Sequence, residues 1–274
     1  MTYFHAPVAR HALFRLSCCV LIALCAPLAH AEVRLYVDDV APYFYREGGA
    51  EKGLFHDVLK ELSARLGRAD TVSALPLARE LEVLRRAPEA LGVVARMPER
   101  EASYTWLFKV LDEEIVLITS ADSKVDISSP TSARQLRVGV LRGSPSESTA
   151  RQLGYTNLSP VAHSEENAGK LAIGRIDAWI AVWPVAVFAQ KQAGLDLGKL
   201  RRGAVLRSFG FYCAASRQFD PAEAEKWRSA FHQMQADGSY SRILRNYDYA
   251  TPALCQGQRC VSSQRRPAPA HSAQ

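Results

Sequence analysis

Two arginines at the end of a short apolar segment have the chemistry of a carboxylate site. Residues 91–95 are small or apolar, and the turn that follows contains Pro98 and carries Arg96 and Arg100. Such a run predicts a buried strand that ends in a loop. Ligands of α/β domains bind outside the carboxyl ends of strands, and a guanidinium there matches a carboxylate. The pattern predicts a site for a small acid, and a solvated turn is the alternative.

The first 31 residues have the composition of an export signal. Arg10 and Arg15 precede an apolar run over residues 16–28, and residues 29–31 read Ala-His-Ala, a small-x-small cleavage pattern. The apolar run is too short for a comfortable membrane span. We therefore expect cleavage after Ala31 and a periplasmic protein, with an uncleaved anchor as the alternative.

The charge balance argues against a nucleic-acid partner. The formal net charge is +6, and it falls to +4 when Arg10 and Arg15 leave with the signal. The basic residues are spread along the chain, without the interleaved aromatic residues of a nucleic-acid-binding surface.

The cysteines predict one local disulfide and no metal site. Of the six cysteines, Cys255 and Cys260 lie close together near the C-terminus, where an oxidising compartment favours a bond between them. No histidine accompanies this pair, so we expect no metal there. We also expect no cofactor. Cys213 lies in an apolar run and is expected to be a buried thiol.

Strand and helix patterns alternate along the rest of the chain, which favours α/β architecture with parallel sheets. The helices are expected to begin near residues 54, 76, 145, 164, 220 and 239. The strands are expected over residues 33–37, 71–75, 91–95, 113–119, 136–141, 176–182 and 209–215.

Two βα repeats separated by extended segments predict two doubly wound lobes joined by a two-stranded hinge. The first lobe would comprise residues 32–118 and 212–250, and the second lobe residues 119–211 with the hinge crossings. Residues 251–274 would form a C-terminal extension that holds the disulfide and ends in a disordered tail.

This order of features resembles extracellular solute-binding protein family 3, the periplasmic components of amino-acid-type ABC importers. The resemblance implies a type II periplasmic-binding-protein fold, a monomer, and a membrane permease as partner. The matching segments cover almost all of the chain after the signal: residues 38–45 (DDVAPYFY), 53–59 (GLFHDVL), 98–101 (PERE), 138–144 (VGVLRGS), 171–178 (LAIGRIDA) and 235–240 (QADGSY).

The resemblance also implies ligand-binding residues. Arg100 would clamp a ligand carboxylate, and Gly143 and Ser144 would donate hydrogen bonds from a helix start. Ser144 is expected to be an N-cap in either case. An aromatic wall would come from three neighbouring residues, of which one or two are expected in the core: Tyr43, Phe44 and Tyr45.

Other polar residues in the matching segments are open to two interpretations. Arg79 and Arg96 would either face the cleft or lie on a solvated surface. Asp177 is expected to serve turn and strand geometry rather than ligand contact.

One departure from the family pattern bears on the ligand. Amino-acid binders usually place an acid for the ligand ammonium shortly after the Gly-Arg-Ile-Asp signature, but residues 179–184 contain none, and Ala181 and Val182 stand there. A buried ammonium without a partner costs several kcal/mol. Either Asp38, Asp39 or another acid substitutes, or the ligand is not an α-amino acid.

The leading hypothesis is therefore a periplasmic solute-binding protein for an amino acid or related organic acid, without catalytic residues. One alternative is an enzyme on the same scaffold, similar to cyclohexadienyl dehydratases, with Glu99, Glu101 and His56 as the nearest candidates for a general acid or base. A sensor or accessory protein is the other alternative.

Overall fold

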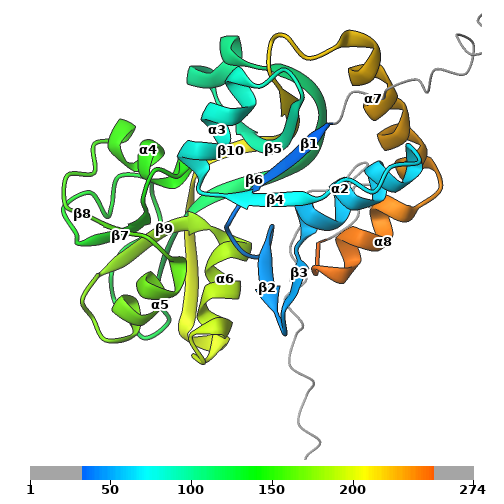
Figure 1. Cartoon of the computed structure of the whole chain (residues 1–274). Coiled ribbons are helices and arrows are strands. Elements are labelled where there is room, and N and C mark those ends of the chain that lie inside the picture. The colour runs from blue at the N-terminus through cyan, green and yellow to red at the C-terminus, as the bar shows by residue number, and fades with distance from the viewer. Residues whose placement is uncertain (1–32, 250–274) are drawn as a thin grey trace, which may run out of the picture. The chain divides into compact units, whose positions relative to one another are not determined.

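The structure is a computed structural model that describes residues 33–249 (Figure 1). The expected signal at residues 1–31 and the expected bond between Cys255 and Cys260 lie outside the described residues. Within residues 33–249, no helix has the length and apolar character needed to cross a bilayer.

A mixed eight-stranded sheet runs through the described residues in the order β4-β1-β5-β10-β6-β9-β7-β8. Three strands at each end pair in parallel, and we call them the first and second half-sheet. The first half-sheet contains β1 (Arg34–Asp38), β4 (Val72–Leu75) and β5 (Ala90–Arg96). The second contains β7 (Val138–Leu141), β8 (Leu158–Val161) and β9 (Ala178–Val182).

Two long antiparallel strands join the half-sheets. They are β6 (Thr105–Ser120) and β10 (Leu200–Ala215), each 16 residues long. The C-terminal part of β10 pairs with β5, whereas the C-terminal part of β6 pairs with β9. Both strands therefore continue from one half-sheet into the other.

Helices cover both faces of each half-sheet. In the first, α3 packs over Val94, and the other face is covered by α2, α7 and α8. In the second, α4 lies on one side of β7 and β9, and α5 and α6 lie on the other (Figure 1). The bounds are α2 (Leu54–Arg65), α3 (Leu77–Arg86), α4 (Pro145–Gln152), α5 (Ser164–Ala172), α6 (Trp183–Gln192), α7 (Pro221–Ala236) and α8 (Ser239–Asn246).

Short elements lie near the strand ends. The hairpin of β2 (Tyr45–Glu47) and β3 (Ala50–Lys52) follows β1, and the 3-10 turn η1 (Pro98–Ser103) follows β5. A second turn, η2 (Leu197–Lys199), leads into β10.

The expected helices and strands are confirmed, and the structure adds strands β2, β3 and β8, helix α6 and the two 3-10 turns, and lengthens two strands. Strand β8 contains Pro160, which is tolerated because β8 is an edge strand. Helix α6 follows β9 directly in one apolar run, whose strand and helix parts periodicity cannot separate. The hairpin β2–β3 and the outer parts of β6 and β10 have mixed burial without a clear period.

Candidate functional site

Two adjoining cavities lie between the half-sheets. The inner cavity has a volume of about 50 Å³ and the outer cavity about 260 Å³. They share four lining residues: Val40, Leu141, Ser164 and Val185. The segment after β1 lines both cavities from one side, and α5 and α6 line both from the other. Side chains from the two half-sheets therefore face each other across one continuous site.

Arg100 from η1 lines the inner cavity. It is half-buried, and its Nη1 donates to the backbone oxygen of Ala95 at 3.2 Å. Burial lowers the pKa of the Arg100 guanidinium, and nearby carboxylates oppose that shift. Among residues 33–249, no carboxylate forms an ion pair with Arg100. Its remaining donors are available to a ligand.

Asp38 ends β1 and lines the inner cavity beside Arg100. Its carboxylate accepts hydrogen bonds from the backbone N–H groups of Asp39 and Leu77. Burial, with the charge of Asp39 added, raises the pKa of Asp38 to about 7. Asp38 is the only acidic residue that lines the inner cavity in the described part of the chain.

Glu80 lies behind this wall on α3 and is fully buried. Neither carboxyl oxygen has a hydrogen-bond partner among the described residues. Burial first, and then the charge of Asp38, raises the pKa of Glu80 well above its usual value. Gly92 of β5 makes room for this side chain, because a Cβ there would lie 3.0 Å from Oε1 of Glu80.

The opposite wall is supplied largely by α4, α5 and β9. This wall holds no acidic side chain. Its residues carry hydroxyl or apolar side chains: Ser144, Ser146, Ser164, Trp179, Ile180, Ala181 and Val182. Ser144 Oγ donates to the Leu141 oxygen at 2.7 Å and accepts from the Glu147 N–H at 3.3 Å. The predicted N-cap is thereby confirmed.

Tyr43 is one of five aromatic residues that line the inner cavity, together with Phe55, Trp179, Phe209 and Phe211. Its ring stacks on Phe55 at 4.4 Å between centroids, and its hydroxyl donates to Oε1 of Glu113 at 2.9 Å. Gly53 permits this arrangement, since a Cβ at that position would lie 2.2 Å from the Tyr43 carbonyl oxygen.

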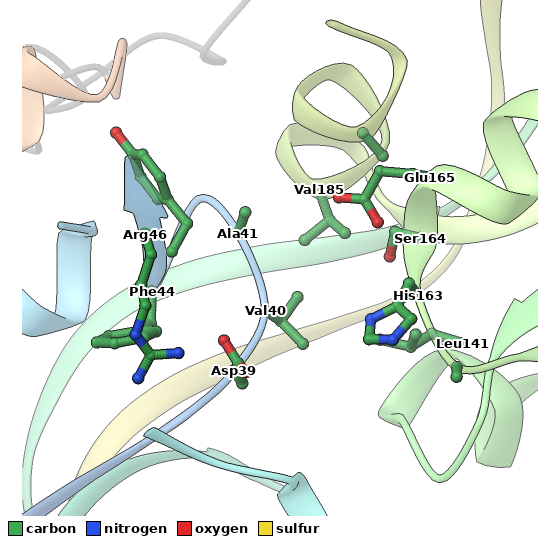
Figure 2. A pocket seen from close by; sticks show the side chains of 13 residues that line it. Asp39, Val40, Ala41, Phe44, Arg46, Leu141, His163, Ser164, Glu165 and Val185 are labelled. Carbon is green, nitrogen blue, oxygen red and sulfur yellow. The ribbon is translucent and has the colours of Figure 1, made fainter. Parts of the chain in front are cut away.

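The outer cavity contains the other two predicted aromatic residues and Asp39. Figure 2 shows Asp39, Phe44 and Arg46 on one side, with His163, Ser164 and Glu165 opposite them. Phe44 is fully buried, whereas Tyr45 reaches α6 and contacts Phe188 at 4.8 Å between ring centroids. Charges of both signs therefore surround the outer cavity.

Three predicted site residues line neither cavity: Arg79, Arg96 and Gly143. Arg79 is exposed on α3. Arg96 lies over Trp106 and Tyr212, at 5.3 and 4.9 Å from the ring centroids, and pairs with Glu101. The N–H of Gly143 donates to Oε2 of Glu147 at 2.7 Å.

Sequence reasoning missed Glu80 and two serines of the site, Ser146 and Ser164. A signal for Glu80 existed, because it lies three residues after Leu77 and four before the buried Leu84, on the apolar stripe of α3. For Ser146 and Ser164 no such signal existed, because hydroxyl residues near helix starts are ordinary capping residues.

The acid or base candidates suggested for an enzyme lie elsewhere. Glu101 pairs with Arg96, and His56 Nδ1 lies 2.9 Å from Oδ1 of Asp57. Neither these two residues nor Glu99 lines the inner cavity. Within residues 33–249, no group of His, Cys, Asp and Glu side chains is placed to hold a metal ion.

Comparison with known proteins identifies the fold. No protein-family model and no curated protein matches the chain. Among solved structures, the arginine-, lysine-, histidine-binding protein ArtJ from Geobacillus stearothermophilus is similar at TM-score 0.70 and 18% identity, over 82% of this chain and 98% of ArtJ. A mutant of ArgBP from T. maritima is similar at TM-score 0.70 and 17% identity, over 79% of this chain and 95% of ArgBP.

A third similar structure is that of an ancestral protein. The ancestral amino acid-binding protein AncCDT-1, described as a precursor of cyclohexadienyl dehydratase, is similar at TM-score 0.66 and 19% identity, over 78% of this chain and 94% of that one. These similarities confirm the predicted type II periplasmic-binding-protein fold. At such identities they identify the fold, and the ligand must be argued from the site.

Proposed function

We propose that this chain is a periplasmic solute-binding protein that captures a small carboxylate-bearing ligand for an ABC-type importer. The fold it shares with solved binding proteins supports a solute-binding role. Closure of the half-sheets on a ligand would create the surface that a membrane permease recognises. We expect the protein to act as a monomer.

The half-buried guanidinium of Arg100 carries the proposal. It lines the inner cavity, its one hydrogen bond goes to a backbone carbonyl, and it has no carboxylate partner among the described residues. A partly desolvated cation without a counter-ion is costly, and a ligand carboxylate would supply that counter-ion in bidentate geometry. The opposing serine hydroxyls and apolar side chains would hold the rest of the ligand.

The inner cavity restricts what else the ligand carries. No acid reaches it from the second half-sheet, so an ammonium group would have Asp38 as its partner there. A longer ligand would extend into the outer cavity, where Asp39, Arg46, His163 and Glu165 offer both signs of charge. The site therefore fits organic acids, and it fits amino acids whose ammonium reaches Asp38 or Asp39.

A thermal-shift screen tests the proposal with amino acids, keto acids and other small carboxylates. A ligand at about a hundred times its Kd adds roughly 2.7 kcal/mol of apparent stability, which raises the Tm visibly. We expect at least one carboxylate to raise the Tm of the natural protein but not of Arg100→Ala. A shift that survives in Arg100→Ala, or no shift with any carboxylate, would contradict the proposal.

An enzyme on the same scaffold is the second candidate, and Asp38 is the observation that favours it. A cavity carboxyl whose pKa lies near 7 has the properties of a general acid or base. The similarity to AncCDT-1 agrees with this alternative at the level of fold. Incubation of each binding carboxylate with the protein separates the candidates, because a binding protein returns its ligand unchanged.

A further inference from the structure

Three ionisable groups meet at the base of the inner cavity, and their charges do not balance if all are ionised. Asp38 and Arg100 line the cavity, and Glu80 lies buried behind them. Each of the three acts electrostatically on the other two. Two carboxylates and one guanidinium would give the empty site a net negative charge, which opposes the capture of an anion.

Glu80 does not behave as an ionised carboxylate in this group. It is fully buried, and no described residue donates a hydrogen bond to either of its oxygens. A carboxylate in such surroundings takes up a proton and becomes neutral. Because protonated Glu80 is neutral, the positive charge of Arg100 in the inner cavity can be neutralised by Asp38 or by a bound ligand.

Of the three groups, Asp38 is the one whose carboxyl group can gain or lose a proton when a ligand binds. Its carboxylate is held by the N–H groups of Asp39 and Leu77, and the cavity exposes it to an arriving ligand. The charge of Asp39 from its own segment favours the protonated form of Asp38, whereas Arg100 from η1 favours the ionised form. Glu80 from α3 is protonated and adds no charge. Across the inner cavity, α4, α5 and β9 present no ionisable group to it.

We propose that Asp38 competes with the ligand carboxylate for Arg100, so that capture of an anionic ligand is coupled to uptake of one proton by Asp38. This inference rests on the proposed function and adds a specificity rule to it. Ionised Asp38 would repel a simple carboxylate and would attract a ligand with a cationic group. Burial that raises the pKa of Asp38 to about 7 places this change near neutral pH.

Acetate is a suitable probe, because it is a minimal carboxylate and the inner cavity has a volume of only about 50 Å³. Its binding can be followed by saturation-transfer NMR on the methyl protons. We expect the natural protein to bind acetate about tenfold more weakly at about pH 8 than at about pH 6, since each pH unit above the pKa costs up to tenfold. The variant Asp38→Asn should bind at both pH values with the affinity seen at the lower one.

Two matched variants act as controls. Asp39→Asn removes the neighbouring carboxylate, which lines only the outer cavity. Acetate binding should stay pH-dependent in this variant, with a midpoint at lower pH because the charge of Asp39 no longer raises the pKa of Asp38. Glu80→Gln replaces a protonated carboxyl by an amide of the same shape, and it should also keep the pH dependence. Loss of the pH dependence in Glu80→Gln would assign the proton to Glu80 and overturn the role of Asp38.

The remaining outcomes separate this inference from the proposed function. Binding that does not change with pH, or a pH dependence that persists in Asp38→Asn, would overturn the coupling and leave Arg100 as the carboxylate site. Absence of acetate binding at about pH 6 in both proteins would overturn the carboxylate site itself, and the coupling with it. If Asp38→Asn does not fold, carbon-13 NMR of the side-chain carboxyls decides, because acetate must raise the midpoint of Asp38 in the natural protein.

Discussion

Tyr43 and Tyr249 donate hydrogen bonds to the same oxygen, Oε1 of Glu113, at 2.9 and 2.6 Å. Tyr43 forms part of the inner cavity, and Tyr249 is the last residue that the structure describes. Glu113 lies in β6 and is only 8% exposed. Through this carboxyl group, the segment after α8 fixes an aromatic ring that faces the proposed ligand.

Glu113 should make the protein less stable as the pH rises towards neutrality. Burial raises the pKa of Glu113 to about 7, so the folded state keeps a proton that the unfolded state releases above pH ~4.5. The free energy of unfolding should therefore fall by on the order of 3 kcal/mol between about pH 4.5 and about pH 7 from this group. Urea unfolding of Glu113→Gln should show a flatter pH profile than that of the natural protein.

The neighbouring acid provides the control for this measurement. Glu114 is half-exposed and pairs with Arg202 on the surface, so Glu114→Gln should leave the profile unchanged. A profile of Glu113→Gln as steep as that of the natural protein would show that Glu113 is ionised in the folded state.

Arg100→Ala should weaken binding of a carboxylate ligand by about 3–5 kcal/mol, which is roughly two to four orders of magnitude in Kd. Titration calorimetry with a carboxylate found by the thermal-shift screen measures this loss. Arg96→Ala is the matched control, because Arg96 is held by Trp106, Tyr212 and Glu101 and lines neither cavity. A loss below tenfold in Arg100→Ala, or an equal loss in Arg96→Ala, would reject Arg100 as the clamp.

Ser144→Ala should destabilise the protein by about 1 kcal/mol, because α4 loses its N-cap. The hydroxyl accepts from the Glu147 N–H and donates to the Leu141 oxygen, and both partners would lose a bond. Ser148→Ala on the same helix should cost less, since the Ser148 hydroxyl only donates to the Pro145 oxygen. Denaturant midpoints that fall equally in the two variants would contradict the capping role.

Asp177→Asn should destabilise the protein by about 1–2 kcal/mol without changing ligand affinity. Asp177 accepts three hydrogen bonds from Arg137, one from the backbone and two from the guanidinium, at 2.6–3.1 Å. Arg137 lowers the pKa of Asp177, so this contribution is present at neutral pH and is lost as the pH falls below about 4.

The exposed pair of Asp122 and Lys199 gives a comparison for Asp177. Its side chains are 74% and 57% exposed, so Asp122→Asn should cost less than about 0.5 kcal/mol. Equal losses in the two variants, or a loss of ligand affinity in Asp177→Asn, would contradict a structural role for Asp177.

Local patterns in the sequence were sufficient for most of the fold. The buried β5, the apolar stripe of α2 and the Ser144 cap each depend on residues close together in the chain, so their periodicity and spacing predict them. Helix α6 and strand β8 were missed because their residues carry no local signal that distinguishes them from their neighbours. Their structure is decided by packing within the second half-sheet.

The candidate site was predicted in part. Arg100, Ser144 and Tyr43 meet at the inner cavity. Arg79 and Arg96, for which the sequence left a solvated surface as the alternative, line neither cavity. Arg96 ends β5 and its guanidinium lies over two aromatic rings, whereas Arg100 lies in the following turn η1 and reaches the inner cavity. The two rings belong to Trp106 and Tyr212, which come from other strands, so this contact cannot be predicted from residues near Arg96 in the chain.

The sequence by itself determined the alternation of strands and helices, their caps and the absence of an acid at Ala181 and Val182. These features are encoded by residues within a few positions of each other. Only the tertiary structure decided which charges share a cavity. Asp38, Glu80 and Arg100 come from a strand end, a helix and a turn, and their interaction depends on burial and distance in space.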